Sequence, residues 1–565
     1  MSRRLILAVV MLCSILGKSG NTADYYVSPD GSDEYPGTES QPFQTISKAA
    51  ESAYAGDTIH VLAGEYAESV RFTHPGTAES PIRCIGYGSV LIAADGYNWG
   101  VWIDGYLDNQ ATHIEISNFE IINASRGGIR VSWAPFTRVM NCRNHHNGKW
   151  GIFTDYSDDL LIQGNVCFEN QDEHGIYVSN SSDRPVIRGN LCYNNGACGI
   201  QINADPQMEG DGITSDALIE ENTCVSNGAF GGAAINLASV RDSVIRNNLL
   251  VNNLAGGIAA WGDGNGPEWG CKNNRFFNNL IFFEAGQGRW CISLKEGSTD
   301  NMTYNNILIG GRRGSLEFST DSSFTSDFNV MFAVDQNAVV TVEDGAAYSF
   351  ADWQSTGMDM HSVFQEPGET FMEIATGNFH HKPLSKAIDH GFEGDAFIPE
   401  NDIDHQYRYD DPDMPNLGTG SGFYDIGCYE YHGGSIDPTP TPPAKNDVQL
   451  TLEMGATQFY PEDMCFLDLL AENLTGSEIT FDVYLLLDVF GSYYWFPSWQ
   501  STSMDFMALS LSPSESRTMN IIPEFIVPPG VASEIYAFYS AGFESGSISA
   551  DAIISNVAVY SFSFE

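Results

Sequence analysis

The sequence repeats itself at intervals of about 24 residues along the middle of the chain. An isoleucine marks each unit and recurs after 23, 24, 24, 35, 23 and 34 residues, at Ile129, Ile152, Ile176, Ile200, Ile235, Ile258 and Ile292. Around these isoleucines apolar and polar residues alternate, which is the periodicity of a strand and not of a helix. Short strands in a repeat of this length are typical of a parallel β-helix, in which each unit forms one coil. We therefore expect the isoleucines to stack as one inward-facing ladder.

An asparagine followed by apolar residues is the second marker of the repeat, at Asn165, Asn190, Asn222, Asn248, Asn279 and Asn306. Neighbouring coils of a parallel β-helix stack about 4.8 Å apart, so equivalent turn residues come within hydrogen-bond reach of one another. Because an amide side chain both donates and accepts hydrogen bonds, the series predicts a structural ladder at one turn and not a catalytic set.

The second place after these asparagines holds a cysteine in three units and an aliphatic residue in later ones, in the order Cys167, Cys192, Cys224, Leu250, Ile281 and Leu308. This exchange predicts buried free thiols that pack like small hydrophobic side chains. The alternative is a disulfide between stacked coils, which lie close enough for one. No Cys-x-x-Cys pair and no Cys/His spacing typical of zinc is present.

Residues 45–55, ahead of the repeat, have the pattern of a short helix. Thr45 is a suitable N-cap, and one face of the helix is apolar through Ile46, Ala49, Ala50 and Ala53. The open end of a β-helix exposes unpaired strands and core, so we expect this helix to cover it.

Three runs around this helix, YVSPDG at 26–31, PFQTI at 42–46 and GDTI at 56–59, resemble the opening of secreted bacterial pectate-lyase-like proteins. The resemblance covers residues 24–432 and implies a right-handed parallel β-helix that these runs cap. Residues 383–391 and 425–430 resemble the endings of surface-associated proteins of this kind. The superfamily includes lyases, epimerases, hydrolases and proteins without activity, so the resemblance implies no single reaction.

The chain divides into four parts by composition. Arg3 and Arg4 precede an apolar run over residues 5–16, which predicts a secretory signal peptide over residues 1–23. Residues 24–432 are assigned to the β-helix and the Pro- and Thr-rich residues 433–446 to a linker. The alternation in residues 447–565 predicts an accessory β-sandwich. The predicted fold class is all-β: a right-handed parallel β-helix with an N-terminal cap helix, plus a C-terminal β-sandwich.

Charge and hydropathy exclude several classes of binding partner. The chain has 26 Lys and Arg against 73 Asp and Glu, a net charge of −47. A chain this acidic is not expected to bind nucleic acid or anionic lipid, because both need a basic surface. No stretch after residue 23 reaches the ~18 apolar residues of a membrane span, so no membrane insertion is expected. We expect a secreted or cell-surface protein that acts as a monomer.

The two longest intervals of the repeat, 35 and 34 residues, indicate where a functional site could lie. Both carry their extra residues just after the repeat strand, at 204–216 and 261–272. Insertions at the same repeat position leave the same face of a solenoid, so these loops should face each other across the coil of Ile235 and form a groove. Sugar-binding residues are predicted on its floor and walls, at Gln201, Asn203, Asn236, Trp261 and Trp269.

Two kinds of chemistry compete for this groove. The first loop offers hard oxygen ligands for Ca²⁺ in Asp205, Glu209 and Asp211, and calcium neutralises a uronate carboxylate during β-elimination. The base for that reaction would come from Lys295, Arg241, Tyr177, His174 or Lys149. Paired carboxylates would instead perform hydrolysis. The catalytic candidates are Asp205, Asp211, Asp263, Lys295 and Tyr177.

Sequence alone therefore predicts a secreted carbohydrate-active β-helix protein whose partner is an extracellular polysaccharide. A polysaccharide lyase is the first hypothesis, and a glycoside hydrolase is the related one. The alternative is a non-catalytic cell-surface or adhesive protein that binds carbohydrate. A negative protein repels polyanions, which counts against a polyuronate unless calcium screens the charge.

Overall fold

The computed structural model describes residues 22–432, except for 108, 344, 413, 421 and 422, and then a set of separate segments. These are residues 448–453, 458–459, 464–475, 477–489, 492–495, 507–513, 515–526, 535–544 and 558–564. All but the last two residues of the predicted signal peptide, and the whole of the predicted linker, lie outside the described residues. The chain divides into two compact units, residues 1–435 and 436–565. No helix in the described ranges is long and apolar enough to cross a membrane.

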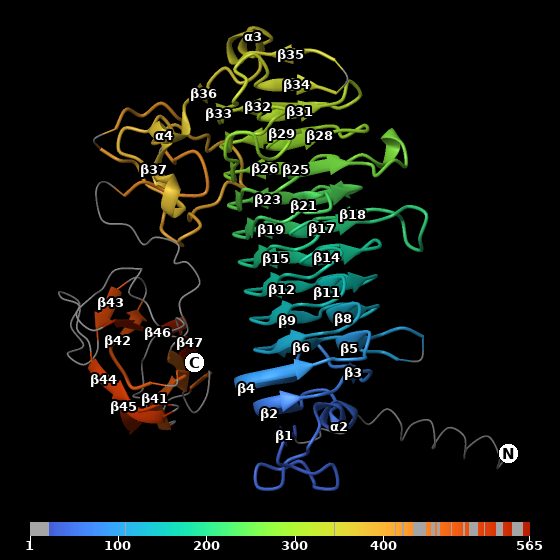
Figure 1. Cartoon of the computed structure of the whole chain (residues 1–565), viewed down its shortest axis with the longest axis vertical. Coiled ribbons are helices and arrows are strands. Elements are labelled where there is room, and N and C mark those ends of the chain that lie inside the picture. Colours follow the sequence, from blue (N-terminus) through green and yellow to red (C-terminus); the bar gives the residue numbers. More distant parts are fainter. Residues whose placement is uncertain are drawn as a thin grey trace, which may run out of the picture. The chain divides into compact units, whose positions relative to one another are not determined.

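The first unit is a parallel β-helix whose coils follow one another from β1 to β35 (Figure 1). Twelve strands form the front sheet: β3 (Val70–Phe72), β5 (Trp99–Asp104), β8 (Gly127–Ser132), β11 (Trp150–Asp155), β14 (Ile176–Ser179), β17 (Ile200–Asn203), β21 (Ala233–Ala238), β25 (Gly256–Trp261), β28 (Ile292–Leu294), β31 (Leu316–Phe318), β34 (Val340–Val342) and β35 (Ala347–Tyr348). These strands pair in parallel except for the last pair, which is antiparallel.

The back sheet has 22 strands, which supply the remaining sides of the coils. They are β1 (Asp24–Val27), β2 (Thr58–Tyr66), β4 (Ile82–Ala93), β6 (Ile114–Ser117), β7 (Glu120–Ile122), β9 (Arg138–Met140), β10 (Arg143–His145), β12 (Leu161–Gln163), β13 (Val166–Phe168), β15 (Val186–Arg188), β16 (Leu191–Tyr193), β19 (Leu218–Glu220), β20 (Thr223–Val225), β23 (Val244–Arg246), β24 (Leu249–Val251), β26 (Arg275–Phe277), β27 (Leu280–Phe282), β29 (Asn301–Tyr304), β30 (Ile307–Ile309), β32 (Phe324–Asp327), β33 (Val330–Phe332) and β36 (Val363–Phe364). Two short pairs complete the unit, β18 (Thr214–Ser215) with β22 (Val240–Arg241) and β37 (Phe371–Glu373) with β38 (Asn378–His381).

The predicted register of the coils is confirmed. The marker isoleucines pair in order from residue 129 to residue 292, and each is fully buried. The turn asparagines form a continuous ladder from Asn165 to Asn329, in which each side-chain amide donates to the side-chain oxygen of the next. A second asparagine ladder, which the sequence analysis missed, runs from Asn147 to Asn253 at another turn.

Size matching between opposite sides of a coil explains the glycines that precede several isoleucines. Cys167, Cys192 and Cys224 stack in register on the back sheet. A side chain at Gly151 or Gly199 would place its Cβ within 2.9 and 2.8 Å of the sulfur atoms of Cys167 and Cys224. The nine cysteines among residues 84–428 are buried free thiols.

Helix α2 (Ile46–Ser52) is the predicted cap helix. The Thr45 hydroxyl accepts a hydrogen bond from the Lys48 amide at 3.1 Å, so it caps the helix as expected. The helix is shorter than the predicted 45–55 because Ala53 already has an extended backbone. Short helices α3 (Phe350–Ser355) and α4 (Pro367–Thr370), and the 3₁₀ turns Pro267–Trp269 and Ile374–Thr376, are the other helical segments of the described residues.

The second unit contains two sheets. One comprises β39 (Val448–Glu453), β41 (Met464–Asn473) and β45 (Ser516–Ile526); the other comprises β40 (Gln458–Phe459), β42 (Ile479–Val489), β43 (Ser492–Trp495), β44 (Met507–Leu511), β46 (Ile535–Glu544) and β47 (Ala558–Phe564). Buried residues of both sheets, such as Leu450, Leu469, Phe481 and Leu509, form one apolar cluster. The predicted all-β fold class, with a β-helix followed by a packed pair of sheets, is confirmed.

Candidate functional site

The outer face of the front sheet carries the two predicted columns of side chains. Tyr177, Gln201 and Asn236 are in register in β14, β17 and β21, and Asn203, Ala238 and Trp261 form the neighbouring column. The two long loops, residues 204–216 and 262–272, leave the ends of β17 and β25 (Figure 1). The structure therefore places both insertions at one edge of one sheet, as the repeat arithmetic predicted.

Two side-chain hydrogen bonds link the end of β17 and its loop to the loop after β25. The Asn203 side-chain amide donates to the Asp263 carboxylate at 3.0 Å, and the Gln207 amide donates to the Asn265 side-chain oxygen at 2.9 Å. Ala238, which lies in register between Asn203 and Trp261, is fully buried. Hydrogen bonds thus bridge the space between the loops, where the sequence predicts a groove.

Gln201 and Asn236 are also less available than predicted. They are 7% and 8% exposed, and the Asn236 amide donates to the Gln201 side-chain oxygen at 2.8 Å. The same Gln201 oxygen lies 3.3 Å from the Cys198 sulfur. This pair is bonded within the protein, so a role in direct sugar binding is not supported by the geometry.

Four of the predicted site residues lie at this edge of the sheet, two in strands and two in the loops, and we call them the Asp263 cluster: Tyr177, Asn203, Asp205 and Asp263. The Asp205 backbone amide donates to the Asn203 side-chain oxygen at 3.0 Å, and the Asn203 amide donates to Asp263. Burial and the charges of Asp205 and Glu296 raise the pKa of Asp263, against the lowering effect of its bond to Asn203. Asp263 is thus the carboxyl group of the cluster whose proton affinity is raised by its surroundings.

Tyr177 completes the cluster as a protonated phenol. Burial, with smaller effects from Glu173, Asp263 and Asp205, raises the pKa of Tyr177 to about 12. A phenol with such a pKa keeps its proton at neutral pH. It therefore suits hydrogen-bond or proton donation better than proton abstraction.

The other proposed bases are engaged elsewhere. Burial works to lower the pKa of Lys295, but hydrogen bonds to Glu317 and Glu343, at 2.8 and 2.9 Å, outweigh it and raise the pKa. Burial lowers the pKa of His174 to about 4, and its Nδ1 accepts from the Cys198 amide at 3.1 Å. Lys149 pairs with Glu173 at 2.7 Å, and Arg241 donates to the Glu268 carbonyl at 2.8 Å. The ion-paired Lys295 is thus a poor candidate base.

Two of the three acidic side chains proposed as calcium ligands form hydrogen bonds within their own loop. Asp205 and Asp211 each accept a hydrogen bond from a backbone amide two residues further on, at 3.0 Å, and Glu209 is exposed. In the part of the chain that the structure describes, no three Asp, Glu, His or Cys residues are grouped to hold a metal ion. Asp205, Glu209 and Asp211 therefore do not form a preassembled three-ligand set.

The two loop tryptophans are half-buried. The indole nitrogen of Trp261 is buried and has no hydrogen-bond partner among the described residues. Trp269 packs against the first loop, because a Cβ at Gly212 would lie 2.8 Å from its ring. Both rings border the Asp263 cluster from the second loop, and part of each remains open to solvent.

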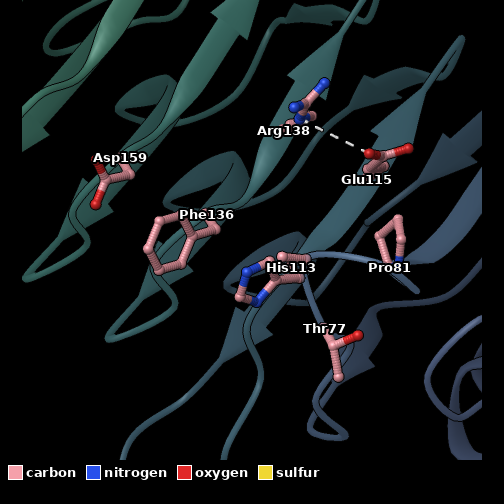
Figure 2. A pocket seen from close by; sticks show the side chains of 8 residues that line it. Thr77, Pro81, His113, Glu115, Phe136, Arg138 and Asp159 are labelled. Carbon is pink, nitrogen blue, oxygen red and sulfur yellow. Dashed lines mark ion pairs between the residues drawn. The ribbon is translucent and has the colours of Figure 1, made fainter.

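A cavity of about 260 Å³ lies on an earlier part of the β-helix (Figure 2). Phe136 and His113 stack along it with ring centroids 4.6 Å apart. Its charged side chains are paired: Glu115 contacts Arg138 at 3.7 Å, and Asp159 binds Arg184. Sequence analysis gave no signal for this cavity, and its ion pairs leave it without a free charged group.

Comparisons with known proteins support the fold. Residues 25–181 match the family described as Pel9A-like, right handed beta helix region, and residues 182–270 match a right handed beta helix region. The pectate lyase PEL9 of Emericella nidulans is 27% identical over 201 residues, which are 35% of this chain and 44% of that protein. The uncharacterized protein YwoF of Bacillus subtilis is 35% identical over 96 residues, 16% of this chain and 20% of that protein.

The matched segment spans less than half of the length of both curated relatives. The crystal structure of pectate lyase Pel9A is 14% identical, with a TM-score of 0.44 over 73% of this chain and 97% of that one. The family matches confirm the resemblance to pectate-lyase-like right-handed β-helix proteins that the opening residues indicated.

Proposed function

We propose that this pectate-lyase-like β-helix protein is a secreted polysaccharide lyase that acts as a monomer on an extracellular polysaccharide, with the Asp263 cluster as its reaction site. The observation that carries the proposal is that Asn203 joins Asp205 and Asp263, one from each loop, by hydrogen bonds within electrostatic reach of the buried Tyr177 phenol. Its sequence similarity to a protein named as a pectate lyase supports the reaction class. The N-terminal pattern and the net charge of −47 support action outside the cell.

The residues of the cluster offer the two proton transfers that β-elimination needs. One group must take the proton next to the uronate carboxylate, and another must give a proton to the leaving oxygen. The carboxylate pair supplies an acceptor, because Asp263 has a raised pKa and Asp205 lies beside it. The protonated Tyr177 phenol supplies a donor.

Calcium dependence is part of the proposal to be tested. Ca²⁺, when bound, would neutralise a uronate carboxylate. Because Asp205, Glu209 and Asp211 are not grouped as ligands, we assign the metal no step in the reaction.

Hydrolysis is the second candidate, and the Asp205–Asp263 pair favours it. Glycoside hydrolases use one carboxylic acid with a raised pKa and one carboxylate. Carbohydrate binding without turnover is the remaining alternative, since proteins of this fold need not be enzymes.

A polysaccharide panel separates these functions. The purified full chain would be incubated with polygalacturonate, alginate and a neutral glucan, in calcium or in chelator, and assayed for unsaturated product by ultraviolet absorbance and for new reducing ends. We expect unsaturated product that is strongly reduced in Tyr177→Phe and Asp263→Asn. Tyr193→Phe, on the back sheet, is the matched control and should keep its activity.

The outcomes differ for each hypothesis. New reducing ends without ultraviolet absorbance would refute the lyase hypothesis and support the hydrolase hypothesis. Binding without either product would favour the non-catalytic alternative. Turnover that is equal in Asp263→Asn, Tyr177→Phe and the control would remove the Asp263 cluster as the site.

A further inference from the structure

Cations and aromatic rings alternate on the outer face of the first front-sheet coils. Arg71, Trp102, Arg130, Phe153 and Tyr177 are in register in five successive strands. The Arg71 guanidinium lies 4.5 Å from the Trp102 ring centroid. The Arg130 guanidinium lies 5.1 Å from the same ring and 5.9 Å from that of Phe153. These distances are in the range of cation–π contacts, so the rings hold the guanidinium groups in place.

The carboxylates that pair with these arginines lie beneath them. Arg71 binds Asp104, and Arg130 binds Asp155 at 2.7 Å. The Asp104 and Asp155 side chains are 2% and 8% exposed, whereas those of Arg71 and Arg130 are 49% and 23% exposed. In each pair, the arginine side chain is therefore more exposed to solvent than the carboxylate.

Arg126 adds an unpaired charge to this surface. Trp99 and Trp150 stack with centroids 5.7 Å apart and an interplanar angle of 7°, over the strand position of Gly127. The Arg126 guanidinium lies 5.2 and 5.3 Å from their ring centroids. The residue is exposed, and no carboxylate of the described residues lies within ion-pair distance of it. A guanidinium carries five hydrogen-bond donors in a planar fork that fits a carboxylate.

Gly127 makes this arrangement possible. A Cβ at residue 127 would lie 2.7 Å from the Trp99 ring. Without a side chain there, the two indoles close over the strand and provide one continuous aromatic surface beneath Arg126. Lys149, which pairs with Glu173 at 2.7 Å, lies 5.2 Å from the Trp150 ring centroid and extends the same surface.

We propose that this surface, the cationic strip, binds the carboxylate groups of an anionic polysaccharide. The strip consists of the cations Arg71, Arg126, Arg130 and Lys149, held by the rings of Trp99, Trp102, Trp150 and Phe153. Its four cations face three carboxylates, Asp104, Asp155 and Glu173, in a chain whose net charge is −47. The inference rests on the proposed function and adds to it a binding surface outside the Asp263 cluster.

Tyr177 connects the strip to the Asp263 cluster. It follows Phe153 in the column of the strip and is itself a member of the cluster. A polysaccharide chain that lies along the coils would thus have carboxylates on the guanidinium groups and a linkage beside Tyr177. Arg126 is a binding residue in this scheme and takes no part in the chemistry.

The test measures binding of the full chain to polygalacturonate in chelator, with fully methyl-esterified polygalacturonate as the uncharged probe. Arg126→Gln should weaken binding to polygalacturonate about tenfold at low salt, the value of one charge-assisted contact. Arg126→Lys should restore part of the loss. Arg143→Gln is the matched control, because Arg143 also lies over a ring, that of Phe168, but on the back sheet. It should bind as the unchanged chain does, and so should every variant towards the esterified probe.

Two results would overturn the inference: equal affinities of Arg126→Gln and Arg143→Gln, or equal binding of the charged and esterified probes by the unchanged chain. A thermal unfolding midpoint within a degree or so of the unchanged chain verifies the fold of each variant. The proposed function fails separately. Binding that depends on Arg126 without any turnover would support the cationic strip and refute the lyase. Turnover together with unchanged binding by Arg126→Gln would support the lyase and refute the strip.

Discussion

Asn222→Ala tests the asparagine ladder that sets the coil register on which both sites depend. Asn222 is fully buried. Its side-chain oxygen accepts from the Asn190 backbone amide at 3.0 Å and from the Asn190 side-chain amide at 2.9 Å. Its own amide donates to the Ile187 carbonyl at 2.8 Å and to the Asn248 side-chain oxygen at 3.0 Å. Alanine removes all four bonds.

The loss of stability follows from the groups left without partners. The Asn190 side-chain amide keeps a bond to the Ile162 carbonyl, and the Asn248 oxygen keeps the Asn222 backbone amide. The Asn190 backbone N–H and the Ile187 carbonyl lose the ladder bond. The Ile187 carbonyl stays within the β15–β19 ladder, so the Asn190 backbone N–H is the group left without a partner. At about 1–3 kcal/mol for a buried group that loses its partner, we expect Asn222→Ala to lower the free energy of unfolding of the β-helix by about 1–3 kcal/mol.

Guanidinium unfolding of the full chain, followed by tryptophan fluorescence, measures this loss as a shift of the β-helix transition to lower denaturant. Gln163→Ala is the control, since Gln163 is exposed on the back sheet and its removal should cost less than about 0.5 kcal/mol. A midpoint for Asn222→Ala that equals that of Gln163→Ala would refute the reasoning, because the ladder would then contribute nothing measurable.

Three further outcomes are expected. Trp261→Ala should weaken glycan binding by about 1 kcal/mol through the loss of an aromatic contact, and unchanged affinity in affinity electrophoresis, with the fold intact, would remove this residue from the site. Burial raises the pKa of Asp389 to about 6, so its folded form holds a proton that the unfolded chain releases near pH 4, and the stability that this group contributes falls as the pH rises from 4 to 6. Asp389→Asn should therefore raise the melting temperature at pH 8 and change it little at pH 4; a gain of equal size at both pH values would contradict the assignment. Burial also raises the pKa of Cys142 to about 12, and all nine cysteines among residues 84–428 are buried, so a thiol reagent at pH 8 should label none of these nine before unfolding; rapid labelling of them in the native chain would show that the coils open.

The register of the coils could be predicted because stacking repeats one environment many times. Each unit of the sequence has the same order of inward and outward positions. The spacing of the isoleucines, and of Asn165 and its equivalents, therefore predicts which residues pair between neighbouring coils. The second asparagine ladder was missed because Asn147 and its equivalents lie in the turn between strands, where no apolar alternation marks the register. Both ladders follow the same hydrogen-bond rule.

The candidate site could be predicted only in part. The spacing of the repeats predicted that the two loops lie at one edge of the front sheet. It could not predict that Asn203 forms a hydrogen bond with Asp263, 60 residues away. That contact depends on how each loop folds back over β21, and no periodicity governs a loop. Lys295 was expected as a base because it occupies an outward position, yet its pairing with Glu317 and Glu343 on later parts of the chain determines its charge state.

The net charge of the whole chain does not describe how charge is distributed on the front sheet. A net charge of −47 counts against a polyanion only if the charges are spread evenly over the surface. On the front sheet they are separated: the guanidinium groups of Arg71 and Arg130 cover buried carboxylates at the early coils, while the loops after β17 and β25 carry exposed acids such as Glu209 and Glu268. A polyuronate would therefore meet attraction at one end of this face and repulsion at the other. Because added salt screens exposed charges, it should weaken binding through the cationic strip and, at the same time, reduce repulsion near the Asp263 cluster. If both sites act on one polysaccharide, affinity should fall steadily with ionic strength, whereas turnover at saturating substrate should hold or rise.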